Sequence, residues 1–339
     1  MIGSLAERLL LCAALLGAAA AAAGADPAPR FALPIDCTPY ADCWPVNYVD
    51  RDPTPGWKDY RCGWHARNDH RGTDLAIADS QAMRAGVAVL AAAAGTVAQT
   101  RDGMEDTGIF GRGGARAVER APCGNGVLLD HGGGWTTKYC HLRKGSVRVK
   151  NGQAVAQGQP LGLVGMSGMT ELPHIHFQVE HDKAVVDPFV GVAGGADCAP
   201  GKAPLWRPEV LARLPYRPVF AYKAGFAAAR PNTDAVRAGL YSEKALPRRA
   251  PMLVFWADFF WTAKGDRLEF RIQDPDGREI LRYDNVLTHN TLRWLYFAGV
   301  RRKGLFWPAG TYRGTARVIR GDGPGGAVDA EISGEILIR

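Results

Sequence analysis

Short apolar runs separated by glycine-containing turns dominate the chain from about residue 65 to residue 190. Examples are "DLAIA", "GVLLDH", "WTTKYCHL", "PLGLVG" and "HIHFQVEH". Apolar runs of about four to eight residues are typical of strands, whereas helices need ~10–12 residues. This part of the chain is therefore predicted to be mainly antiparallel β-sheet with little helix. The segment at 103–122 lacks such a pattern and is expected to be a long surface loop.

A second set of apolar runs fills residues 216–339, including "MLVFWADFFW", "DRLEFRIQ" and "GTYRGTARVIR". About six strands of this kind predict a C-terminal β-sandwich-like domain of unknown role. "DPDG" at 274–277 is a turn sequence in which Gly277 is free to take a positive φ. A Gly-, Ala- and Pro-rich linker is expected at 191–215. The domain's tryptophans are expected in its core rather than on a sugar-binding surface: Trp256, Trp261, Trp294 and Trp307.

The first 25 residues have the composition of a secretory signal peptide. Arg8 precedes an apolar stretch from Leu9 to Ala23, and small residues lead into Asp26. The stretch of about 15 residues is shorter than the ~20 that span a bilayer, so we expect cleavage after Ala25 rather than a retained anchor. No later segment is expected to cross a membrane. The sequence therefore predicts an exported protein, with periplasm and secretion both open.

Cysteine content agrees with export. Of seven cysteines, Cys12 lies in the signal peptide, which leaves an even number: Cys37, Cys43, Cys62, Cys123, Cys140 and Cys198. An even number in an oxidising compartment predicts disulfides. Cys123 and Cys140 flank a predicted hairpin and are expected to be near neighbours, while the other pairings stay open. Residues 26–62, rich in Pro and Cys, are expected to form an extended N-terminal arm.

The net charge of +7 and the pI of about 9.1 favour anionic surfaces such as cell-wall polymers. Lys and Arg are spread through both halves, and no nucleic-acid motif accompanies them. A nucleic-acid partner is therefore not expected. The oligomeric state is left open.

"PHIHFQV" places His174 and His176 on one face of a predicted strand. Two imidazoles this close repel if both are protonated, whereas metal ligation requires neutral rings. The pair alone is equally compatible with a surface pair. "HRGTD" adds His70 and Asp74, and Gly72 between them allows a sharp turn that aims both at one point. With one histidine of the later pair they make three ligands, which leaves the open position of a catalytic zinc site.

A third segment, "TTKYCHL", is expected to place Tyr139 and His141 on one strand face and Cys140 on the other. His141 and the spare histidine of the pair are then candidates for moving protons and for stabilising a developing oxyanion. The chain has no HExxH glutamate, so histidine must carry this work. His131 is expected to be structural. His65 is expected to be a loop histidine, with a position lining the groove as the alternative, and His181 and His289 have no assigned role.

The three segments together resemble the motifs of the M23 family of zinc metallopeptidases, the lysostaphin and LytM type. "KNGQAVAQGQPLGLVGMSGMTELPHIHFQV" is similar to the run that leads into the family's last catalytic strand. The resemblance covers roughly residues 60–190 and implies a peptidase domain at 63–190. It also implies an antiparallel β-sheet groove as the fold.

The resemblance implies specific roles and a substrate. One Zn²⁺ per chain would be held by His70, Asp74 and His176, and His141 and His174 would be catalytic. The family's usual substrates are the peptide stems and crosslinks of bacterial peptidoglycan, so a zinc endopeptidase is the leading interpretation. A non-catalytic wall-binding protein or amidase activator is the alternative, because many family members have lost ligands. Two departures, at 169–173 and at 103–122, bear on which peptide is accepted.

Overall fold

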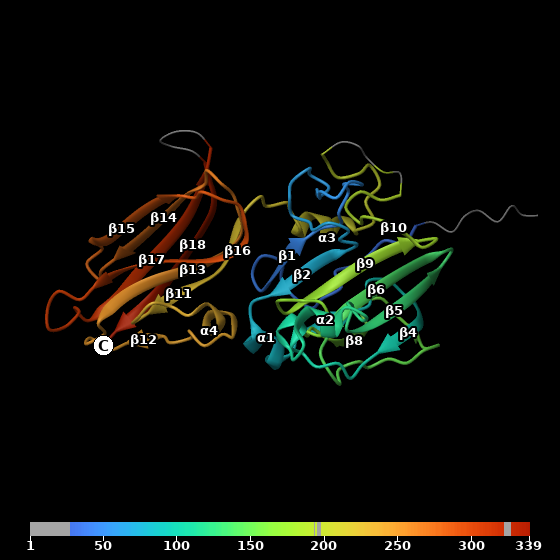
Figure 1. Cartoon of the computed structure of the whole chain (residues 1–339), viewed down its shortest axis with the longest axis horizontal. Helices are drawn as coiled ribbons and strands as arrows, with labels where there is room; N and C mark the ends of the chain where they lie inside the picture. Colours follow the sequence, from blue (N-terminus) through green and yellow to red (C-terminus); the bar gives the residue numbers. More distant parts are fainter. Residues whose placement is uncertain (1–27, 193, 195–197, 322–326) are drawn as a thin grey trace, which may run out of the picture.

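Two β-sheet units lie side by side in the computed structural model, which describes residues 28–192, 194, 198–321 and 327–339. In Figure 1 the first unit runs from blue to yellow-green and the second from yellow to red. The expected signal peptide lies outside the described residues. Within them, no helix is both long and apolar enough to cross a membrane.

The main sheet of the first unit is antiparallel throughout. Its strand order is β1 (Cys43–Asn47), β2 (Thr73–Ile77), β9 (His174–His181), β6 (Trp135–Leu142), β5 (Asn125–Gly132), β4 (Gly95–Arg101) and β7 (Ala154–Val155), with β10 (Ala184–Val185) beside β9. A small second sheet pairs β3 (Ala88–Leu90) with β8 (Pro160–Leu163). The predicted antiparallel β class is confirmed.

One face of the main sheet is buried and the other carries polar side chains. Ile175, Phe177 and Val179 of β9 are at most 1% exposed and pack in the core with Leu75 and Tyr139. Because side chains alternate along a strand, His174, His176 and Gln178 lie on the opposite face. The predicted shared face of the two histidines is confirmed.

Helices are few and short in the described part of the first unit. They are α1 (Ser80–Ala85), the 3-10 turn η1 (Gly108–Phe110), α2 (Gly114–Val118) and α3 (Pro208–Arg213). The side chain of Asp79 caps α1 by accepting a hydrogen bond from the Ala82 amide at 2.8 Å. The expected patternless loop at 103–122 thus contains η1 and α2. Both are too short to show a helical period in the sequence.

The second unit is a β-sandwich, as predicted. One sheet contains β11 (Phe220–Ala227), β13 (Met252–Thr262) and β16 (Thr291–Arg301). The other contains β12 (Ala245–Leu246), β18 (Ala327–Ile338), β17 (Gly310–Arg320), β14 (Arg267–Gln273) and β15 (Glu279–Val286), and α4 (Thr233–Arg237) follows β11. Phe255, Phe270 and Tyr312 are fully buried in its core.

Two smaller expectations about the second unit have different outcomes. Gly277 has φ +79°, which confirms the turn at 274–277. Three of the four tryptophans are buried, but Trp294 is 51% exposed and does not belong to the core. Trp294 lies near the start of β16, at the edge of the three-stranded sheet, where few neighbours cover it.

All six cysteines expected in the exported chain are paired. Cys123 is bonded to Cys140, as expected, and the other disulfides join Cys37 to Cys43 and Cys62 to Cys198. The expected N-terminal arm also contributes β1, which pairs with β2 at the edge of the main sheet. All five residues of β1 are buried, so it shows no alternation of apolar and polar residues that would reveal it in the sequence.

Candidate active site

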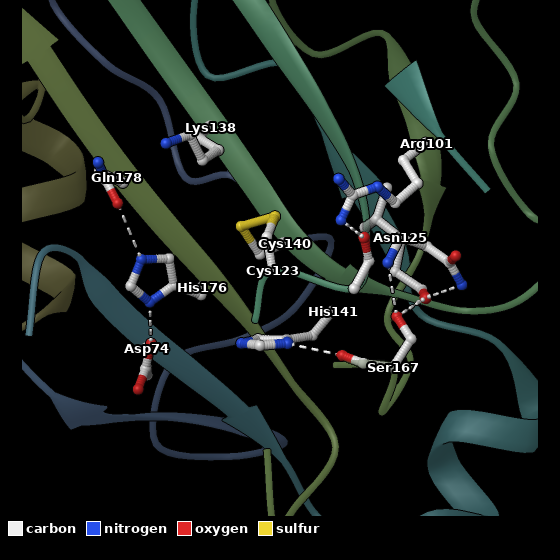
Figure 2. Close-up of a disulfide and its surroundings, with 12 residues drawn as sticks. Asp74, Arg101, Cys123, Asn125, Lys138, Cys140, His141, Ser167, His176 and Gln178 are labelled. Atoms are coloured by element: carbon white, nitrogen blue, oxygen red, sulfur yellow. Dashed lines mark hydrogen bonds and ion pairs between the residues drawn. A yellow bond between two sulfur atoms is a disulfide. The ribbon is translucent and has the colours of Figure 1, made fainter. Parts of the chain in front are cut away.

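Strand pairing gathers the candidate site residues on the polar face of the main sheet. His176 of β9 lies directly opposite Asp74 of β2 on one side and Cys140 of β6 on the other. Figure 2 shows the His176 ring between Asp74 and Gln178. Residues from three separate segments of the sequence therefore meet at one place.

His70, Asp74 and His176 form a compact group of possible metal ligands. Nε2 of His70 lies 3.0 Å from Oδ2 of Asp74, and Nδ1 of His176 lies 2.8 Å from Oδ1 of Asp74. One ligand atom from each residue lies within 4.8 Å of the others. A single small cation can therefore contact all three side chains.

Gly72 is needed here for space. A Cβ atom at this position would lie 2.7 Å from the His176 ring and 2.6 Å from the Phe177 carbonyl oxygen. Its φ lies outside the positive range, so the sharp turn expected from the sequence is not the reason for a glycine. Any side chain at position 72 would push the ligand segment away from β9.

The N-terminal arm orients two of these residues. Nδ1 of His70 donates a hydrogen bond to the Tyr48 carbonyl oxygen at 2.7 Å, which leaves Nε2 free as a ligand atom. The Asn47 amide donates to Oδ2 of Asp74 at 2.7 Å. Sequence reasoning missed both contacts because neither residue belongs to a motif.

The charge of Asp74 suits a cation site. Its burial favours the neutral acid, but His70, His174 and the hydrogen bond from His176 outweigh burial and hold the pKa of Asp74 well below its usual range. For His70, burial lowers the pKa and Asp74 raises it, with a net increase. Burial chiefly lowers the pKa of His176, so its ring tends to be neutral. The ionised Asp74 carboxylate beside the neutral His176 ring is the state that metal ligation requires, whereas His70 must release its ring proton at Nε2 to bind a metal.

The side chains of β6 do not lie on the faces of the sheet that the sequence predicted. Tyr139 is fully buried, and its hydroxyl accepts a hydrogen bond from the Ala92 amide at 2.8 Å. Cys140 lines the cavity above the polar face, on the same side as His176. His141 also lines this cavity because its φ of +65° interrupts the strand alternation. Tyr139 and His141 therefore do not share a face, although His141 still reaches the site.

His141 and His174 lie beside the ligand group with their rings held in similar ways. Nδ1 of His141 donates to the Ser167 carbonyl oxygen at 2.7 Å (Figure 2), and Nδ1 of His174 donates to the Leu172 carbonyl oxygen at 2.9 Å. The two ring centroids are 4.6 Å apart. Burial is the main reason that the pKa of His141 lies well below its usual range. Both Nε2 atoms remain available for proton transfer.

A cavity of about 480 Å³ covers these residues, and a smaller hollow of about 170 Å³ adjoins it. Cys123 and Lys138 line both, so the disulfide in Figure 2 lies where the two meet. Met169, Glu171 and Leu172 line the larger cavity. The segment at 169–173, whose sequence differs from the family pattern and is expected to affect which peptide is accepted, therefore lies at the site.

Other histidines lie apart from this cavity. His65 is 2% exposed, and its ring stacks on Trp261 and Tyr216 at centroid distances of 4.3 and 5.0 Å. His131 is hydrogen-bonded to the Ala94 carbonyl oxygen and to Thr137, as expected of a structural residue. Trp261 and Tyr216 come from outside the peptidase-like segment, and no local pattern marks them as neighbours of His65.

An antiparallel sheet that carries a His-Asp-His group on its polar face is the arrangement found in the metal-dependent peptidase class. Residues 68–188 match the model of peptidase family M23, and the chain therefore carries an M23 peptidase domain. The recognition made from the three motifs is confirmed.

Individual relatives match part of the chain. The chain is 44% identical to the cell division protein DipM of Caulobacter vibrioides over 64 residues, 19% of this chain and 10% of that protein. It is 33% identical to the peptidoglycan DD-endopeptidase ShyA of Vibrio cholerae over 110 residues, 32% of this chain and 20% of that protein. The catalytic domain of lysostaphin from Staphylococcus simulans is 25% identical, with a TM-score of 0.25 and coverage of 36% of this chain and 77% of that one. The matched regions are thus a fifth or less of the two curated relatives.

Proposed function

We propose that this protein is a zinc-dependent endopeptidase that hydrolyses peptide bonds in the stems or crosslinks of peptidoglycan. The observation that carries the proposal is the meeting of three possible ligands with two further histidines in one open cavity. Neither group alone defines an enzyme. Together they provide a cation site and groups for acid–base chemistry.

The residues fit a zinc ion. Two imidazole nitrogens and a carboxylate are a usual catalytic ligand set for zinc, and three protein ligands leave a position for water or substrate. The orienting bonds from Tyr48 and Asn47 are of the kind that support metal-ligating residues. When bound, zinc supplies Lewis-acid polarisation of the peptide carbonyl and lowers the pKa of a water.

His141 and His174 divide the proton chemistry in this proposal. Each uses Nδ1–H on a backbone carbonyl, so each presents Nε2 to the cavity. One ring accepts a proton from the attacking water at its bare Nε2 and becomes an imidazolium. The other ring donates to the oxyanion or to the leaving amine, and for this it must carry a proton on Nε2 as well as on Nδ1. The buried, neutral ring of His141 is suited to accept a proton.

Substrate and location follow from the relatives and from bulk properties. ShyA is named a peptidoglycan DD-endopeptidase, and we extend this substrate class to the present chain. Three disulfides suit an oxidising compartment, and the net charge of +7 suits an anionic wall. We therefore place the enzyme in the periplasm or outside the cell.

Metal analysis of purified variants tests the site assignment. We expect one zinc per chain in wild type, and the same zinc content in His141→Ala and in His174→Ala. Asp74→Ala and His176→Ala are expected to lose most of it, because a three-ligand site tolerates no missing ligand well. Equal zinc in all five proteins would contradict the assignment. Zinc retained without hydrolysis in wild type would favour a non-catalytic wall-binding role.

A further inference from the structure

The two units meet through an apolar cluster. It consists of side chains that are at most 8% exposed: Trp44, Val46, Ala76 and Leu172 from the first unit, and Phe220, Tyr222, Phe260 and Trp261 from the second. We call this set the interdomain cluster. In Figure 1, β1 lies on the side of the main sheet that is nearest to the second unit.

The interdomain cluster lies on the same face of the main sheet as the candidate active site. Trp44 is directly opposite Ala76, and Ala76 is directly opposite His174. Directly opposed residues in antiparallel strands project from the same face. The second unit therefore packs against the polar face of the sheet, next to the strand position that carries His174.

Leu172 connects this packing to the chemistry. Its side chain belongs to the interdomain cluster, and its carbonyl oxygen accepts the hydrogen bond from Nδ1 of His174. The Leu172 amide donates to Oγ1 of Thr170, and the Thr170 hydroxyl lies 3.1 Å from the same His174 nitrogen. The position of the 170–172 segment therefore sets the orientation of the His174 ring.

Polar contacts hold the second unit in place at this interface. Lys223 forms an ion pair with Asp79, the residue that caps α1. Nε2–H of His65 donates to the Pro218 carbonyl oxygen at 3.1 Å, and the His65 ring stacks on Trp261. These contacts add to the apolar packing in holding the second unit against the first.

We infer that the C-terminal β-sandwich is a positioning element for His174, which acts through Leu172 and Phe260. Phe260 is 2% exposed and stacks on Phe220 within the interdomain cluster. Neither Leu172 nor Phe260 contributes a ligand atom to the metal group. The expected effect on kcat rests on the proposed hydrolysis. The expected effect of the sandwich on the 170–172 segment does not.

The test uses three variants of the full-length chain: two that shorten a buried side chain to alanine, and one conservative substitution. Phe260→Ala removes packing at the interdomain cluster, and Phe260→Leu restores most of the apolar volume. Leu268→Ala is the control, because Leu268 is 1% exposed in the sandwich core and lies outside the interdomain cluster. Hydrogen exchange of a peptide spanning 166–177, zinc content, kcat and KM are measured for each.

Phe260→Ala is expected to speed amide exchange in 166–177 and to lower kcat by about 10- to 100-fold at similar KM and zinc content, since a small misplacement of a catalytic group has effects of this size. Phe260→Leu should restore most of the wild-type amide exchange in 166–177 and most of kcat. Leu268→Ala should leave both quantities unchanged. Equal exchange in Phe260→Ala and Leu268→Ala would overturn the coupling. If wild type shows no hydrolysis, the proposed function fails while the exchange result still decides the coupling.

Discussion

At the scale of single residues, His141 shows where strand alternation stops being a guide. Its motif identifies it as a candidate in the sequence, but a positive φ, rather than strand alternation, brings the side chain to the cavity. Non-glycine residues with positive φ are uncommon and are often held by local structure at functional sites. Here the bond from Nδ1 to Ser167 holds the ring in place.

Replacing His141 or His174 by alanine tests the division between ligands and proton-transfer groups. We expect kcat to fall by about 10²–10⁴-fold in each variant, which is the usual contribution of general acid–base catalysis. Zinc content and KM should change little. Loss of zinc together with activity would show that the residue is a ligand instead. The control is His131→Ala, because His131 lies away from the metal group.

His65 predicts a pH dependence of stability. Burial is the main cause that lowers the pKa of His65 from 6.5 to about 3. Between these values the unfolded chain binds a proton on this ring and the folded chain does not, so stability decreases as the pH falls below about 6.5. The loss attributable to His65 is about 2 kcal/mol at pH 5, at ~1.4 kcal/mol per pH unit.

The variant His65→Phe should lose this part of the pH dependence. Arg320 also donates to the Pro218 carbonyl oxygen, so the substitution leaves that acceptor with a partner. Urea unfolding of wild type and His65→Phe at pH 7 and pH 5 measures the difference. An equal loss of stability in both proteins between these pH values would refute the assignment.

At the scale of elements, the Cys123–Cys140 disulfide joins the segment before β5 to β6 beside His141. It lies between the two hollows of the polar face. The sequence indicated this pair because a short predicted hairpin separates the cysteines. It gave no basis for the other pairs, since Cys62 and Cys198 are 136 residues apart and meet only through tertiary structure.

Removal of this disulfide should destabilise the chain and disturb the site. Cys123→Ala with Cys140→Ala is expected to lower the free energy of unfolding by about 2–4 kcal/mol. The matched control removes Cys37 and Cys43, which are six residues apart and close a shorter loop. Denaturant unfolding and kcat are measured for both. A larger kcat loss in the control would contradict a role for the Cys123 pair in holding His141.

The elements of the peptidase domain differ in how well the sequence predicts them. β9 and β6 follow from alternating residues and motif position, because one face is buried and the other polar. β1 does not, because its five residues are all buried and it lies in a segment rich in proline and cysteine. Its last residue, Asn47, and the following residue, Tyr48, nevertheless bond to two of the proposed ligands.

At the scale of the whole molecule, the order of the two β units could be predicted from the spacing of apolar runs. Their contact could not, because the residues of the interdomain cluster come from segments that are far apart in sequence. Apolar side chains in strands give no sign of whether they pack within a unit or between units. The relation between the sandwich and His174 is therefore visible only in three dimensions.

Metal removal should lower the stability of the folded chain. A ligand that binds only the folded state adds about 2.7 kcal/mol when its free concentration is 100 times its Kd. Thermal unfolding of wild type should therefore shift to lower temperature with a chelator and recover with added zinc. His176→Ala should show little shift, and a shift as large as that of wild type would contradict a role for His176 as a ligand.

The most direct test of the account is digestion of isolated peptidoglycan sacculi by the purified chain, with zinc and separately with a chelator, followed by mass spectrometry of the released muropeptides. We predict zinc-dependent loss of crosslinked or stem-peptide species by wild type, with little or none by His174→Ala. The cleavage products would identify the bond. Intact sacculi with a wild-type preparation that holds one zinc per chain would contradict the proposed peptidoglycan endopeptidase.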